Sequence, residues 1–154
     1  MITIGTARAV ADLAEGLVIA TVEVPAAAER VFEALASDEV CRWWVRPGVF
    51  DTREWTADVR PGGRWRATGV GGGRPYALEG EFIEVDSPHR LLHTWTLSGA
   101  PEATTNVEYV LEPADGGTRV TLRQSRFAGR GACGATALGW ETSFEELARM
   151  LRGD

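Results

Sequence analysis

The sequence predicts an α+β fold in which a curved antiparallel sheet of about seven strands packs around one long C-terminal helix. Three observations support this. Residues 138–151 have the apolar spacing of an amphipathic helix, residues 53–125 alternate apolar and polar residues between turn sequences, and one strand with two short helices precedes them. Because the helix and the sheet each have an apolar face to cover, we expect these faces to pack together.

The N-terminal part predicts few regular elements. Residues 1–15 are rich in alanine without a clear period, which predicts an irregular lead-in. The β-branched segment Leu17–Val24, bounded by glycine and proline, predicts the first strand. Apolar residues at helical spacing predict a helix over residues 26–36, and a Ser-Asp pair can cap a second short helix over residues 38–44.

The middle of the chain alternates with period two, which is typical of strands with one buried face. Turn sequences separate these strands: Pro-Gly-Gly at 61–63, Ser-Pro at 87–88 and Asp-Gly-Gly at 115–117. The predicted strands cover residues 53–59, 64–68, 76–86, 89–97, 103–113 and 118–125. Because short turns join consecutive strands, the sheet should be an antiparallel meander.

The last predicted helix covers residues 134–152. On a helical wheel, Trp140, Phe144, Leu147 and Leu151 fall within roughly 60° of one another. Acidic and basic residues occupy the other side, so the helix has one face for the sheet and one for solvent.

Composition limits the function classes. At 154 residues the chain suits one domain over residues 1–154. Its net charge of −6 argues against nucleic acid or an anionic membrane as partner, since both attract basic surfaces. The sequence has no long apolar run and no signal-peptide pattern, which predicts a cytoplasmic protein without membrane insertion. Two cysteines and two histidines without short spacing predict no metal site, and no nucleotide motif indicates a cofactor.

Seven motifs occur along the chain in one order: Val31-Phe-Glu-Ala-Leu35, Trp43-Trp44, Val59-Arg-Pro-Gly-Gly-Arg-Trp65, Gly80-Glu-Phe-Ile-Glu-Val-Asp-Ser-Pro88, Arg90-Leu-Leu-His-Thr-Trp95, Gly116-Gly-Thr-Arg-Val-Thr-Leu122 and Gly139-Trp140. Together they resemble the family of homologues of the activator of heat shock protein 90 ATPase, within the START-like, or SRPBCC, helix-grip superfamily. The resemblance covers residues 17–152. It implies a helix-grip fold with a cavity between the sheet and the C-terminal helix.

Strand alternation predicts which side chains face that cavity. Tyr109 lies on the face of Val107 and Leu111, and Gln124 on the face of Val120 and Leu122. By the same alternation His93 and Trp95 share a face, and Ile83 and Val85 bring Glu81 inward with them. The candidate ligand-binding residues are Trp43, Trp65, Trp95, Tyr109, Gln124, Trp140 and Phe144. Each tryptophan can instead be part of the core, or can serve both purposes.

His93 and Glu81 are the candidate catalytic residues. An imidazole beside a carboxylate in an apolar cavity could act as a general acid–base pair on a polyketide or aromatic ligand. The alternatives are a structural histidine and a glutamate paired with an arginine at the rim of the cavity.

The resemblance leaves three functions open. The first is binding of a small hydrophobic or aromatic ligand, and the second is a polyketide cyclase/aromatase-like reaction in the same cavity. The third is an interaction module like the chaperone-activating domain, which would use the outer surface. An exposed Trp43-Trp44 pair could also serve a homodimer or the entrance of the pocket.

Overall fold

The computed structural model describes residues 7–152 except residues 99, 101–102 and 128–129. In chain order its elements are β1 (Arg8–Asp12), β2 (Leu17–Val24), α1 (Ala28–Ala36), α2 (Val40–Trp43), β3 (Val45–Arg46), β4 (Phe50–Ala57), β5 (Arg64–Gly71), β6 (Arg74–Asp86), β7 (Arg90–Leu97), β8 (Thr105–Ala114), β9 (Gly117–Ser125) and α3 (Arg130–Leu151). In this described part of the chain, nine strands form one sheet in the order β1-β2-β9-β8-β7-β6-β5-β4-β3. Every neighbouring pair is antiparallel.

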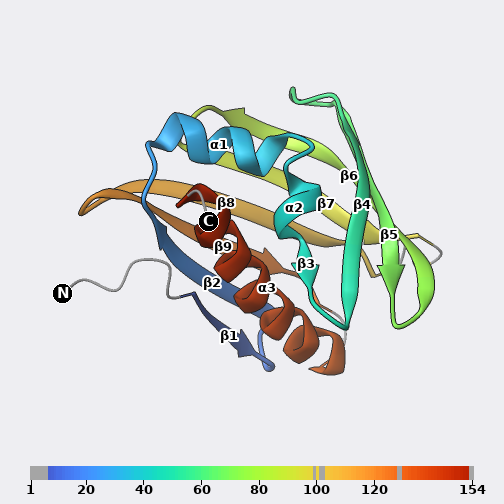
Figure 1. Ribbon diagram of the computed structural model, residues 1–154. Coiled ribbons are helices and arrows are strands. Elements are labelled where there is room, and N and C mark those ends of the chain that lie inside the picture. The colour runs from blue at the N-terminus through green and yellow to red at the C-terminus, as the bar shows by residue number, and fades with distance from the viewer. Residues whose placement is uncertain (1–6, 99, 101–102, 128–129, 153–154) are drawn as a thin grey trace.

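The sheet curls around α3, which lies along its concave face (Figure 1). The helix contacts β1 and β2 at one edge of the sheet and β3 at the other. The predicted α+β helix-grip fold is therefore confirmed. The sheet has nine strands rather than about seven, because β1 and β3 had no signal in the sequence.

The irregular lead-in expected over residues 1–15 is wrong for residues 8–12, which form β1; residues 1–6 lie outside the described residues. β1 pairs with β2 from Arg8 opposite Thr21 to Asp12 opposite Leu17. The backbone N–H of Ala9 also donates to the Glu141 carboxylate of α3 at 3.1 Å. Hydrogen bonding to β2 and to α3 therefore holds this segment as a strand, although its alanine-rich sequence shows no period.

α1 and α2 carry the chain from β2, inside the sheet, to β3 at its far edge (Figure 1). Both lie within the predicted ranges 26–36 and 38–44. α1 buries Val31, Phe32 and Leu35. The indole N–H of Trp43 in α2 donates to the carbonyl of Ala34 in α1 at 2.8 Å, which fixes the angle between the two short helices.

α3 begins at Arg130, four residues before the predicted start at residue 134, and ends at Leu151. Its predicted apolar face is confirmed: Trp140, Phe144 and Leu147 are buried, and Leu151 is partly buried. Within the described residues, no helix is both long and apolar enough to cross a membrane.

The predicted inward face is correct for β8 and β9 and wrong for β6. Tyr109 and Gln124 are buried, whereas Glu81 and Ile83 are exposed. Phe82 is buried in place of Glu81 and Ile83, and the pairing of β6 with β7 shifts between Phe82 and Glu84. This bulge reverses which residues of β6 face inward. Val85 is partly buried, but residues before the bulge that share its odd-numbered alternation face outward.

Gly80 in β6 allows a close approach between strands. The Trp65 side chain of β5 passes over it, and the indole N–H donates to the carbonyl of Thr94 in β7 at 3.1 Å. A Cβ atom at Gly80 would lie 2.0 Å from that carbonyl oxygen and 2.5 Å from the Trp65 Nε1. Only glycine fits here without moving backbone.

We therefore expect Gly80→Ala to lower the free energy of unfolding by about 3 kcal/mol, the upper range of overpacking costs. Denaturant titration followed by tryptophan fluorescence measures this change. Gly134→Ala is the matched control, because a Cβ there meets nothing within 4 Å on an exposed helical position. It should stabilise the protein by about 1 kcal/mol through helix propensity. Equal effects of the two substitutions would contradict the close approach at Gly80.

Candidate functional site

All six tryptophans of the chain belong to one cluster of contacting rings, and Trp44 is its centre. The ring centroid of Trp44 lies between 4.8 and 5.9 Å from those of the five others, which are Trp43, Trp55, Trp65, Trp95 and Trp140. Four of these contacts are edge-to-face, the geometry that aromatic rings favour. The cluster joins α2, β4, β5, β7 and α3.

Gln124 ties the cluster to the sheet. Its Oε1 accepts a hydrogen bond from the indole N–H of Trp140 at 2.7 Å, and its Nε2 donates to Thr105 Oγ1 at 2.8 Å. The Thr105 hydroxyl in turn donates to the carbonyl of Trp95 at 3.3 Å. Since both ends of this buried amide are engaged within the protein, Gln124 positions Trp140.

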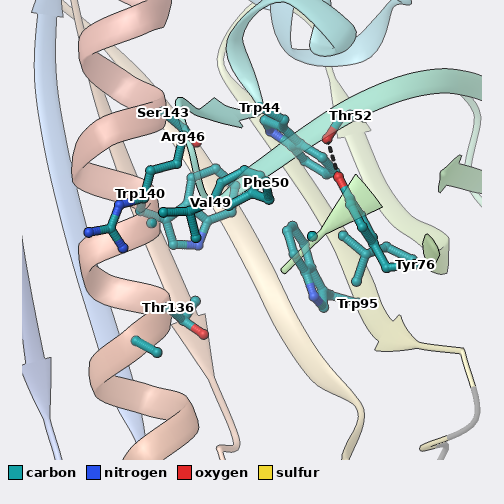
Figure 2. A pocket seen from close by; sticks show the side chains of 14 residues that line it. Trp44, Arg46, Val49, Phe50, Thr52, Tyr76, Trp95, Thr136, Trp140 and Ser143 are labelled. Atoms are coloured by element: carbon teal, nitrogen blue, oxygen red, sulfur yellow. Dashed lines mark hydrogen bonds between the residues drawn. The ribbon is translucent and has the colours of Figure 1, made fainter. Parts of the chain in front are cut away.

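A cavity of about 380 Å³ lies beside this cluster, between α3 and the β3–β7 part of the sheet. Figure 2 shows its walls, with Trp140 on α3 and Trp95 and Tyr76 on the sheet. It is lined by Trp44, Arg46, Val49, Phe50, Thr52, Gly71, Tyr76, Leu78, Trp95, Ala135, Thr136, Gly139, Trp140 and Ser143. Most of this lining is apolar or aromatic, as in sites for small molecules.

The cavity owes its space to small side chains on α3. Ala135, Gly139 and Ser143 are four residues apart, so they form one stripe of the helix. The bulky residues of α3 form the neighbouring stripe and fill the core. Phe50 of β4 lies beside Gly139, where a Cβ would be in ordinary van der Waals contact with its ring at 3.7 Å. The stripe and the β3–β4 hairpin therefore face each other across the cavity.

The polar groups of the cavity are few. The hydroxyls of Thr52 and Tyr76 are 2.6 Å apart and share a hydrogen bond (Figure 2). Burial raises the pKa of Tyr76, so at neutral pH its phenol is a donor rather than a base. Arg46, Thr136 and Ser143 supply the remaining polar side chains. Among the described residues, the lining contains no carboxylate and no imidazole.

His93 lies in the core outside the cavity lining. Its ring centroid is 5.0 Å from that of Trp65, 5.8 Å from Phe82 and 6.0 Å from Tyr109. Its Nδ1 lies 2.8 Å from the carbonyl oxygen of Thr94, which can only accept, so the proton of the neutral ring is on Nδ1. Burial lowers the pKa of His93 to about 4, which keeps the imidazole neutral at pH 7.

The expected pairing of His93 with Glu81 is wrong. Glu81 is exposed on the outer face of β6, where its backbone N–H donates to the Thr94 hydroxyl at 2.9 Å. His93 points to the inner face. The physical reason is the burial of Phe82, which turns the preceding glutamate outward.

Tyr109 and Trp44 place two further polar atoms in the core. The Tyr109 hydroxyl and the Trp44 indole N–H are buried without a partner at hydrogen-bond geometry in the described residues. Burial raises the pKa of Tyr109, and the nearby Trp44 indole opposes this shift in part.

Of the seven predicted ligand-binding residues, Trp95 and Trp140 line the cavity. The other five, Trp43, Trp65, Tyr109, Gln124 and Phe144, are buried in the adjoining core. The assumption that Trp43 and Trp44 are exposed is wrong, because their exposed fractions are 0% and 3%. Sequence reasoning missed the lining residues of β3, β4 and β6. The stripe of small residues on α3 was the signal that could have located the cavity.

A curved sheet that holds a C-terminal helix, with an apolar cavity between them, defines a helix-grip protein. The chain belongs to the family described as activator of Hsp90 ATPase homolog 1-like protein, whose model matches residues 25–152.

Solved structures share this fold. A protein from Rhodobacter sphaeroides is 25% identical with a TM-score of 0.76, and the match covers 94% of this chain and 96% of that one. A protein from Arthrobacter aurescens is 18% identical with a TM-score of 0.80, covering 95% and 91%. DynU16, described as a protein in the dynemicin biosynthetic locus, is 25% identical with a TM-score of 0.71; the match covers 90% of this chain and 48% of DynU16. A search of curated proteins found no match.

The low pKa of His93 predicts a pH dependence of stability. Below pH 6.5 the unfolded chain protonates this histidine, whereas the folded protein keeps it neutral until about pH 4. The unfolded state therefore binds more protons in this window, and His93 should reduce the free energy of unfolding by about 3 kcal/mol as the pH falls through it. Denaturant titrations should show that the free energy of unfolding of the natural protein falls by this amount more than that of His93→Gln between pH 7 and pH 4.

His89→Gln is the matched control, because His89 is the other of the two histidines of the chain and is exposed. Its stability curve should stay parallel to that of the natural protein. A parallel curve for His93→Gln would contradict the buried, neutral state of His93.

Proposed function

We propose that this protein binds a small hydrophobic or aromatic molecule in the cavity between α3 and the sheet. The observation that carries the proposal is the cavity itself, about 380 Å³ in volume and walled by Trp44, Trp95 and Trp140. This volume lies in the lower part of the range of roughly 300–1,000 Å³ typical of ligand sites. The packed rings, of which Trp44 and Trp140 are buried and Trp95 is partly buried, keep the cavity in shape before a ligand enters, which lowers the entropic cost of binding.

The chemistry of the lining supports binding rather than acid–base catalysis. A general base needs a pKa near the working pH, and the lining has neither imidazole nor carboxylate. Tyr76 has a raised pKa and offers only a donated proton. Because His93 lies outside the lining, the acid–base pair predicted from the sequence has no place in this cavity.

A second candidate function is a cyclase-like reaction in the same cavity, favoured by the similarity to DynU16 from a biosynthetic locus. Such a reaction would use the hydrogen-bonded Thr52–Tyr76 pair as proton donor. Mass spectrometry of an aromatic polyketide after incubation distinguishes the two functions. A ligand recovered unchanged supports binding, and conversion that is lost in Tyr76→Phe supports catalysis. The third candidate, a chaperone-type interaction module, rests on the family description alone.

Binding can be measured with the neutral fluorescent probe N-phenyl-1-naphthylamine. We expect its fluorescence to rise on addition of the protein. A free probe concentration of a hundred times Kd should stabilise the fold by about 2.7 kcal/mol, which appears as a higher Tm. Thr136→Trp places an indole in the cavity and should abolish both effects while leaving the protein folded.

The matched control is Thr142→Trp, the same substitution on the same helix at a position outside the cavity lining. This variant should bind the probe like the natural protein. If Thr136→Trp also binds it unchanged, the ligand site lies elsewhere and the proposal fails.

A further inference from the structure

Among the described residues, one charged side chain lines the cavity, that of Arg46 at the end of β3. Arg46 is half-buried, and no carboxylate of the described residues forms an ion pair with it. Asp51 on the adjoining strand β4 pairs with Arg53 at 3.1 Å instead. A cation beside an apolar space, without a counter-ion from the protein, attracts an anion from outside.

Ser143 of α3 supplies a second unused group. Its side chain is buried, with 3% of the residue exposed, and it lines the cavity. Its neighbour Thr142 donates to the carbonyl of Leu138 one turn earlier at 3.2 Å, the usual outlet for a hydroxyl on a helix. Ser143 has no such bond to any of the residues that the structure describes, so its hydroxyl can donate to a ligand.

The two groups lie on the same side of the cavity. Figure 2 shows Arg46 and Ser143 on the α3 side, while the Thr52–Tyr76 pair lies on the opposite wall with Trp95. The contact between α3 and β3 agrees with this placement. The α3 side of the cavity therefore carries Arg46 and Ser143 beside Trp140, and the sheet side carries the Thr52–Tyr76 pair beside Trp95.

We infer that the ligand is an organic acid whose carboxylate binds the Arg46 guanidinium and the Ser143 hydroxyl, while its aromatic or apolar body lies against Trp95 and Trp140. This inference rests on the proposed function and adds the class of ligand. The planar guanidinium has two parallel N–H groups that match the two oxygens of a carboxylate. A neutral ligand of the same shape would leave Arg46 without a partner.

Two probes of the same shape test this inference: 2-naphthoate, which is anionic at pH 7, and neutral 2-naphthalenemethanol. Each is titrated against bound N-phenyl-1-naphthylamine, and its Kd follows from the displacement. We expect the acid to bind about tenfold more tightly than the alcohol, since a charge-assisted hydrogen bond is about twice as strong as a neutral one. Equal affinities would overturn the inference and leave the proposed function intact, whereas failure of the neutral reporter to bind would remove the proposed function.

Three variants locate the anion. Arg46→Met should raise the Kd of 2-naphthoate about tenfold and leave the Kd of the alcohol unchanged. Arg46→Lys should restore part of the preference for the acid. Ser143→Ala should weaken the acid less than Arg46→Met does, because it removes a neutral donor. An unchanged Kd for 2-naphthoate in Arg46→Met contradicts the role of Arg46, and an unchanged Kd in Ser143→Ala contradicts that of Ser143.

Arg66→Met is the matched control for charge. Arg66 is exposed in β5, between buried Trp65 and Ala67, so it lies on the outer face of the sheet. Its removal changes the net charge as Arg46→Met does and should leave both affinities unchanged. If Arg66→Met weakens the acid as much as Arg46→Met, the preference reflects overall charge rather than the cavity, and the inference fails.

Discussion

The packing of Trp44 is the constraint on which the rest of the interior depends. This residue stands between α2 and β3, where the chain passes from the short helices to the edge of the sheet. Its ring contacts every other tryptophan, and through them it connects the sheet to α3. Because it also lines the cavity, the ring that organises the core also forms part of the wall of the site. Core and cavity therefore share the Trp44 ring, and a substitution of Trp44 would affect both.

Hydrogen bonding within the cluster determines what the cavity can recognise. The indole N–H groups of Trp43, Trp65 and Trp140 donate to Ala34, Thr94 and Gln124, respectively. Trp140 consequently presents carbon atoms to the cavity and contributes apolar surface. Polar selectivity then depends on the few hydroxyls of the lining and on Arg46. This division between an apolar wall and a few placed polar groups is the arrangement that gives small-molecule sites their specificity.

The sequence predicted those parts of the molecule in which a strong period and a buried face coincide. The apolar stripe of α3 through Trp140 and Phe144, and the inward position of Tyr109, follow directly from helix and strand geometry. Glu81 was misplaced because a bulge shifts the alternation of β6, and a bulge leaves no mark in apolar spacing. Arg46 was missed for a different reason: β3 has two residues and exists only through its pairing with β4. Such elements depend on tertiary contacts, which a local pattern does not contain.

The cavity and the core use different stripes of the same helix, and this separation has a functional consequence. The stripe of Trp140 and Phe144 must remain bulky to fill the core, whereas Ala135, Gly139 and Ser143 line the cavity. Substitutions in the second stripe and in the β3–β4 hairpin can change the size and polarity of the cavity with little effect on the core. The helix-grip architecture therefore allows different ligands on one fold, which is why membership of the family does not determine the ligand. In the site proposed for this chain, Arg46 and Ser143 are the groups that would select an organic acid.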